Sequence, residues 1–230
     1  MAHRTPRSSY ERLSTRLNLF PQGAAPSDLL YQILALLFST AEAELVAALP
    51  IKPFTAELAA RNWKVSVVEA EKILQRLAGR ALLVDIRGKD KTEYVMPPPM
   101  AGFFEFALMR TRGDIDQKLL SELYEQYISV EDDFIRQLFL TGNTQLGRVF
   151  VLEDSVSSEH ALHVLDYERA TQVIETADEI GVGLCYCRHK REHQGKACDA
   201  EVNICMTFNT VAASLVRSEY ARRIDRSECI

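Results

Sequence analysis

The 230-residue chain is 47% hydrophobic and 26% charged, which is ordinary for a globular protein and excludes the disordered and fibrous classes. The net charge of -5 is unevenly distributed: residues 1–100 carry 13 basic and 10 acidic side chains, whereas residues 101–230 carry 14 and 22. An excess of three positive charges is too small to be a nucleic-acid footprint by itself. The length predicts two domains.

The beginning of the chain shows no targeting or membrane-spanning signal. Residues 1–9 are polar and basic, and the first apolar run, 29–38, is shorter than the roughly 20 apolar residues that a membrane span needs. Residues 1–24, which contain Pro6, Pro21 and Gly23, are expected to form an irregular arm or a short helix. We therefore expect a cytoplasmic protein without a membrane span.

Residues 25–99 are predicted to form a winged-helix-like domain. Helices are expected over 28–39, 41–49, 55–62 and 66–78, where Ser27 and Ser66 are suited to cap two of them. Two short apolar runs, 81–86 and 92–96, flank a turn and predict a hairpin. Helices followed by a hairpin are the winged-helix order, and Pro97-Pro98-Pro99 ends the domain.

A winged helix can bind DNA through its third helix and its wing. Two glutamates on the third helix, Glu69 and Glu71, would repel phosphates, so the wing gives the better argument for such binding. The alternative is that the wing is a solvated turn. The candidate DNA contacts on the helix and the wing are Lys72, Arg76, Arg87, Lys89 and Lys91.

Residues 100–230 are predicted to form a mainly helical domain, so that the whole chain belongs to the mainly α class with a small β hairpin (α+β). An apolar segment around 103–108 is followed by expected helices over 116–128, 131–140 and 167–180 and by short strands over 148–153 and 162–165. Gly181 and Gly183 should end the last helix and leave the first cysteines on a loop.

Four of the five cysteines lie within 21 residues, in the pattern C-x-C-x10-C-x6-C: Cys185, Cys187, Cys198 and Cys205. Such crowding is not typical of a disulfide framework, and soft thiolate ligands favour an iron-sulfur cluster or zinc. The spacing fits neither a zinc knuckle nor the ferredoxin pattern. A cluster, a zinc ion and unligated thiols all stay open at this point.

Basic residues follow the first two cysteines directly: Arg188, His189, Lys190 and Arg191. They could offset the negative charge of a thiolate-bound cluster, or they could form a solvated basic loop. His189 and His193 could also replace one thiol as ligands. No P-loop, dinucleotide fingerprint or zinc-protease motif is present, and Ser158-Glu159-His160 is only a run of polar neighbours.

The chain resembles a family of ferredoxin-related iron-sulfur proteins of anaerobes. The resemblance rests on "LPIKPFTAELAA" from Leu49, "MPPPMAGFFEFALMR" from Met96, "DIDQKLLSELYEQY" from Asp114, "LGRVFVLE" from Leu146 and "CYCRHK" from Cys185. It implies a [4Fe-4S] cluster on Cys185, Cys187, Cys198 and Cys205. Further cysteine motifs commonly follow in that family, so we expect the C-terminal domain to be shortened and Cys229 to be a bystander.

The leading hypothesis is an electron-transfer protein that works with a redox partner, as a carrier or as a subunit of an oxidoreductase, with self-association left open. One alternative is a redox-responsive, winged-helix transcription regulator that binds nucleic acid. Another is a protein-interaction module that a structural zinc stabilises.

Overall fold

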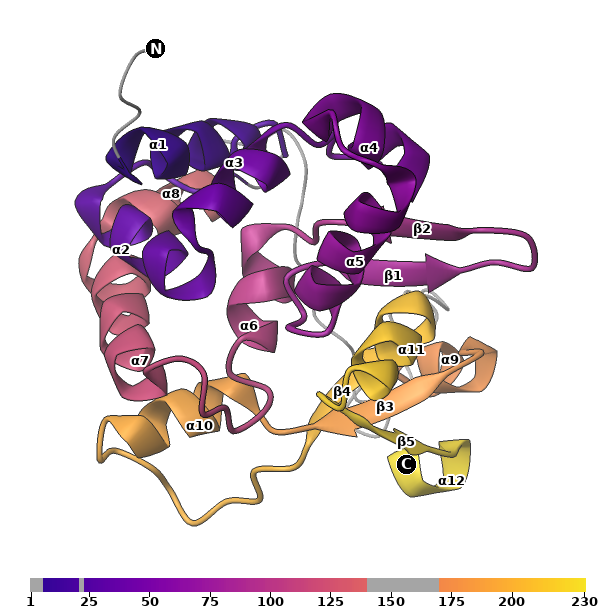
Figure 1. Ribbon diagram of the computed structural model, residues 1–230. Coiled ribbons are helices and arrows are strands. Elements are labelled where there is room, and N and C mark those ends of the chain that lie inside the picture. The colour runs from indigo at the N-terminus through magenta and orange to yellow at the C-terminus, as the bar shows by residue number, and fades with distance from the viewer. Residues whose placement is uncertain (1–5, 21–22, 140–169) are drawn as a thin grey trace.

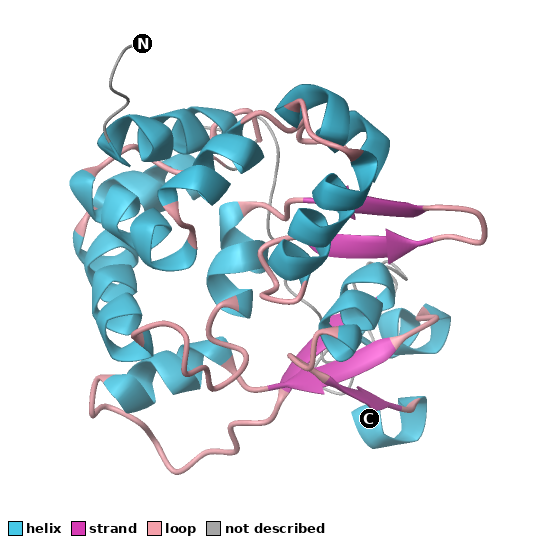
Figure 2. Ribbon diagram, viewed as in Figure 1, coloured by secondary structure: helices cyan, strands magenta, loops and turns pink. Residues whose placement is uncertain are grey.

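The computed structural model describes residues 6–20, 23–139 and 170–230, and the described chain is mainly helical with two small antiparallel sheets (Figures 1 and 2). The mainly α, α+β class predicted from the sequence is therefore confirmed. The first half contains five helices and a hairpin: α1 (Pro6–Leu17), α2 (Asp28–Leu37), α3 (Thr40–Ala47), α4 (Ala56–Trp63), α5 (Val67–Ala78), β1 (Val84–Arg87) and β2 (Thr92–Val95).

The local signals in this half act as expected. Ser27 accepts a hydrogen bond from the backbone of Leu30 at the start of α2, and Ser66 accepts one from Glu69 at the start of α5. The two strands of the hairpin pair antiparallel over their full length. The expected arm before residue 25 contains the 12-residue helix α1, which is buried in the core along one side.

The second half begins with a π-helical turn and continues through short elements. They are η1 (Pro99–Phe103), α6 (Phe104–Phe106), α7 (Gln117–Glu125), the π-helical η2 (Gln126–Val130), α8 (Asp132–Phe139), α9 (Ala170–Thr176), β3 (Ile180–Gly183), α10 (Tyr186–His193), β4 (Cys205–Phe208), α11 (Asn209–Arg217), β5 (Arg222–Ile224) and α12 (Arg226–Cys229).

One hydrophobic core extends from α1 to α8 and joins the segments before and after the three prolines. Its centre is aromatic: the ring of Phe104 lies 4.8 Å from that of Phe103 and 5.0 Å from that of Tyr124, measured between centroids. All three side chains are fully buried. The apolar segment after the prolines therefore packs against the N-terminal helices as well as against α7.

The sequence prediction fails at the end of the expected 167–180 helix. Helix α9 ends at Thr176, and Ile180 begins β3, the central strand of a three-stranded sheet in the order β4-β3-β5. Gly181 and Gly183 do not end a helix but let this strand approach its neighbours closely, since a Cβ at position 183 would lie 2.5 Å from the Tyr220 carbonyl oxygen. The strands expected over 148–153 and 162–165, the start of the 167–180 helix and the trio at 158–160 lie outside the described residues.

Within the described ranges, no single helix is both long enough and apolar enough to cross a membrane. Helices α2 and α3 reach that length and composition only when taken together, and they are bent by 103° relative to each other.

The hairpin is joined to α11 by a buried carboxylate, that of Asp85 on β1. Asp85 accepts hydrogen bonds from the hydroxyl of Ser214 at 2.6 Å and from Nε of Arg217 at 2.8 Å, and its backbone carbonyl accepts another from Arg217 at 2.7 Å. Nε of Arg87 lies 3.0 Å from the same carboxylate. Burial alone would raise the pKa of Asp85, but the bonds from Arg217 and Ser214 bring it below its usual value.

Asp85→Asn should therefore lower the free energy of unfolding by about 2 kcal/mol at pH 7, because it leaves two arginines facing a neutral amide. Since the folded pKa is depressed, the stabilisation by Asp85 is present above the unfolded pKa of about 3.9 and is lost as the pH falls below it. Urea unfolding at pH 7 and at pH 3 measures both effects. Asp90→Asn, in the exposed turn of the same hairpin, is the matched control, and an equal loss in both variants would contradict this role of Asp85.

Candidate functional site

The pairing of β3 with β4 brings the first and last of the clustered cysteines to one place. Gly183 at the end of β3 is paired with Cys205 at the start of β4. Two residues beyond Gly183, Cys185 forms the N-cap of α10, and its N–H donates a hydrogen bond to the Val202 carbonyl at 2.6 Å. The segment before Cys205 thus folds back onto the start of α10.

Three thiols lie close enough to influence one another. Burial raises the pKa of Cys187, and the neighbouring Cys185 raises it further through its charge and a hydrogen bond. Burial raises the pKa of Cys205 to about 11, with Cys185 and Cys187 adding to the rise, while the backbone N–H of Tyr186 opposes it by bonding to the sulfur. Cys185, Cys187 and Cys205 therefore gather around the N-terminal end of α10.

The fourth cysteine, Cys198, is exposed, and it lines a cavity of about 330 Å³ together with Cys187. The other walls of this cavity are Tyr186 and four basic side chains, those of Arg188, Lys190, Arg191 and Lys196. The cavity therefore has thiols and cations on its walls and no acidic residue, which suits a ligand of negative charge.

Cys187 and the basic residues after it lie on helix α10, so the loop expected for the first cysteines ends at Cys185, and the basic residues do not form a loop. Lys190 and Arg191 bind the two carboxylate oxygens of Glu125 on α7 at 2.8 and 3.2 Å. Arg188 donates to the Glu201 carbonyl. These contacts hold α10 against α7, where Figure 1 places it, and fix the return segment over the cysteines.

His189 and His193 also lie on α10, one helical turn apart. Nδ1 of the buried His189 is 2.8 Å from the Leu108 carbonyl oxygen, and its Nε2 is 3.1 Å from Nε2 of His193. Neither imidazole lines the cavity beside Cys187 and Cys198. The alternative in which a histidine replaces one thiol therefore gains no support from this arrangement.

Within residues 6–20, 23–139 and 170–230, no three His, Cys, Asp or Glu side chains form a group arranged for a single metal ion. A zinc ion would need four donors, with sulfurs at about 2.3 Å from one centre. A cubane cluster has a different requirement, since each of its four thiolates binds a separate iron atom. In the described residues the four thiols therefore do not form a site for a single metal ion.

The candidate DNA contacts are largely occupied by ion pairs within the chain. Arg76 lies 3.5 Å from Glu42, Arg87 binds Asp85, and Lys91 binds Glu93 at 2.8 Å. Lys72 and Lys89 are exposed. Most of the positive charge expected on the wing is thus offset by neighbouring carboxylates.

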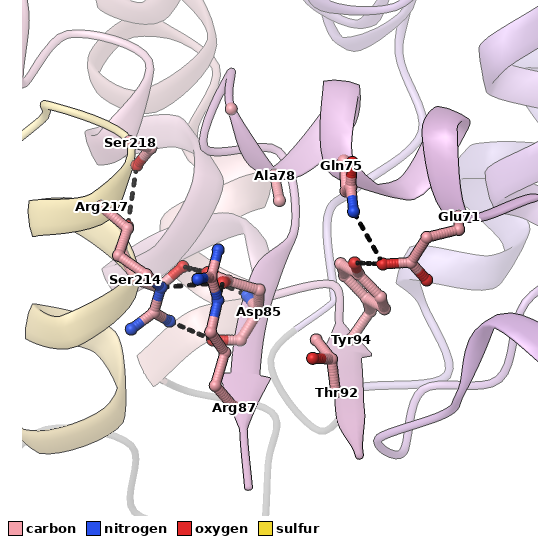
Figure 3. A pocket seen from close by; sticks show the side chains of 11 residues that line it. Glu71, Gln75, Ala78, Asp85, Arg87, Thr92, Tyr94, Ser214, Arg217 and Ser218 are labelled. Atoms are coloured by element: carbon pink, nitrogen blue, oxygen red, sulfur yellow. Dashed lines mark hydrogen bonds and ion pairs between the residues drawn. The ribbon is translucent and has the colours of Figure 1, made fainter. Parts of the chain in front are cut away.

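A larger polar cavity, of about 480 Å³, lies between α5, the hairpin and α11, and sequence reasoning missed it (Figure 3). One end holds the Asp85 cluster, and at the other end Glu71 accepts hydrogen bonds from the Tyr94 hydroxyl at 2.7 Å and from Gln75 at 2.9 Å. The charged groups that line this cavity bind other residues of its walls, which indicates that the cavity is a structural junction between α5, the hairpin and α11. The one sequence signal for it was Asp85, an acidic residue inside an otherwise apolar strand.

Cys229 stands apart from the other four cysteines. It is buried in a small core with Ile174 and Ile224, and its thiol contacts the sulfur of Met206 at 3.2 Å. That Cys229 is a bystander stays a prediction.

Comparison of the chain with known protein families, with curated proteins and with solved structures finds no match.

The raised pKa of Cys205 predicts slow alkylation in the metal-free protein. At pH 8 a thiol with a pKa of about 11 has on the order of 100 times less thiolate than a free cysteine, and its burial slows the reaction further. Iodoacetamide labelling followed by peptide mass spectrometry measures the rate at each cysteine, with the urea-unfolded protein as control. Equal rates at Cys205 and at the exposed Cys198 in the folded protein would contradict the described geometry.

Proposed function

We propose that this chain is a cytoplasmic electron-transfer protein that binds one [4Fe-4S] cluster through Cys185, Cys187, Cys198 and Cys205. The observation that carries the proposal is the strand pairing that places Cys205 beside the start of α10, where Cys185 and Cys187 lie, together with the cavity that Cys187, Cys198 and basic side chains line. A cluster bound there would take up and release one electron at a time.

The protein's own residues contribute charge, hydrogen bonding and rigidity at this position. A cubane on four thiolates is negatively charged, and Arg188, Lys190, Arg191 and Lys196 line the cavity that it would adjoin. The Tyr186 N–H donates to the sulfur of Cys205, which stabilises the thiolate form. Because thiols with raised pKa values must lose protons to become ligands, loading releases protons and should be favoured at higher pH.

Tyr186 separates this position from the main core. The ring is partly buried and packs against both the main core and the smaller cluster that contains Phe106 and Leu215. Burial raises the pKa of its hydroxyl, so that the side chain stays neutral beside the thiols. Tyr186 thus packs toward the core between Cys185 and Cys187, while Cys187 and Cys198 remain exposed to a partner.

The test is iron, sulfide and zinc analysis with visible absorption spectroscopy on anaerobically purified protein. We expect close to four iron and four sulfide per chain, and loss of both in Cys185→Ser/Cys198→Ser. Cys229→Ser is the matched control, because it removes a thiol outside the group and should leave the iron content unchanged.

Zinc alone at one equivalent would instead favour the interaction module with a structural zinc. Iron that persists in the double variant and disappears in Cys229→Ser would contradict the assignment of ligands. The transcription-regulator alternative predicts salt-dependent binding to duplex DNA that weakens when Lys89 and Lys91 are replaced.

A further inference from the structure

We propose that His189 and His193 form a metal site of their own, separate from the cysteines, which takes a divalent late first-row metal of the nickel or copper class. The two residues are four apart on α10, so both imidazoles leave the helix on the same face. The site does not depend on whether the cysteines bind a cluster. His189 lies two residues after Cys187, on the opposite face of the same helix, and His193 is the last residue of that helix.

The first argument is the tautomer of His189. A carbonyl oxygen can only accept, so the 2.8 Å contact with Leu108 places a proton on Nδ1 and leaves a lone pair on Nε2 of the neutral ring. A histidine that ligates a metal through one nitrogen almost always donates its other N–H to a carbonyl or carboxylate. His189 is thus already held in the ligating tautomer, with its free nitrogen toward His193.

The second argument is the geometry of the pair. Two imidazoles on one metal, with bonds of about 2.1 Å at a right angle, have their nitrogens about 3.0 Å apart and their ring centroids about 4.6 Å apart. The observed distances are 3.1 Å between the Nε2 atoms and 4.6 Å between the centroids. A straight N–H···N hydrogen bond of the same length would place the centroids about 5.4 Å apart. The two nitrogens therefore converge on a shared point beside the helix.

The third argument is the local charge. Burial and the neighbouring His189 lower the pKa of His193, and the carboxylates of Glu192 and Asp116 oppose this shift and attract a cation. The nearby Lys190 and Arg191 are bound to Glu125. His193 is also the last residue of α10, and the C-terminal end of a helix carries partial negative charge.

The distances between the two imidazoles fit a right angle at a shared metal, and this angle indicates the class of metal. Nickel(II) and copper(II) favour square-planar or tetragonal sites with imidazole ligands, whereas structural zinc is almost always tetrahedral. Among the described residues no third His, Cys, Asp or Glu completes the group, so water or an external donor would fill the remaining positions. His193 is half-exposed, which gives the metal access from solvent.

Calorimetric titration of the untagged full chain with Ni²⁺ tests the site, together with absorption spectra that report thiolate coordination. We expect one Ni²⁺ per chain, no thiolate charge-transfer band, and an affinity that falls at least about tenfold in His193→Ala, because even the loss of an outer hydrogen-bond partner costs about 10- to 100-fold. Binding should persist in His3→Ala and in Cys185→Ser/Cys198→Ser. Circular dichroism checks that each variant is folded.

Unchanged Ni²⁺ affinity in His193→Ala would overturn the proposal. Loss of binding in His3→Ala would assign the metal to the N-terminal residues, and loss in the cysteine variant with disappearance of a charge-transfer band would assign it to the thiols. Either result would also overturn it. Since none of these outcomes concerns iron or sulfide, the result is independent of the cluster test.

Discussion

The arrangement of the cysteines depends on how closely β3 can approach the segment after α11. At Gly183 the Tyr220 carbonyl oxygen occupies the space that a side chain would need, so any residue with a Cβ would push β3 outward. With glycine there, β3 lies between β4 and β5 and pairs Gly183 with Cys205. The chain then turns into α10 after two residues, which brings Cys185 and Cys187 to the same place. The close approach of Gly183 to the Tyr220 carbonyl thus determines where Cys185, Cys187 and Cys205 come together.

Helix α10 is fixed at this position by polar contacts that would be costly if left incomplete. Lys190 is buried and is paired with Glu125, and the buried His189 is bonded to the Leu108 carbonyl. A buried charge without its partner is destabilising by several kcal/mol, so α10 has one favourable orientation on α7. The same contacts explain why the basic residues after Cys187 are ordered on a helix. These basic side chains hold α10 against α7, and they also line the cavity beside the thiols.

Local signals in the sequence were sufficient for the first half of the fold. Capping serines, apolar periodicity and the turn between two apolar runs act within a few residues, and Ser27, Ser66 and the β1–β2 hairpin appear where they were expected. The secondary structure of the region before the cysteines was harder to predict, because its apolar residues continue at helical spacing up to Ile180. The strand there is only four residues long, and both of its faces are buried, so it has no alternation to reveal it. The proximity of Cys185 to Cys205 arises from that strand pairing and could not be inferred from spacing.

The two ends of α10 differ in the chemistry that they can support. The N-terminal end presents backbone N–H groups and partial positive charge, which favours thiolates, and the Tyr186 N–H already bonds to Cys205. The C-terminal end carries partial negative charge, and the second half of the helix presents the imidazoles of His189 and His193, the latter near the carboxylates of Glu192 and Asp116. Two residues of an α-helix correspond to a rotation of about 200°, so His189 lies on the opposite face of α10 from Cys187, and His193 lies about 9 Å further along the axis than Cys187. Soft sulfur donors and imidazole nitrogens prefer different metals, and their placement on opposite faces lets one short helix keep the two kinds of site distinct.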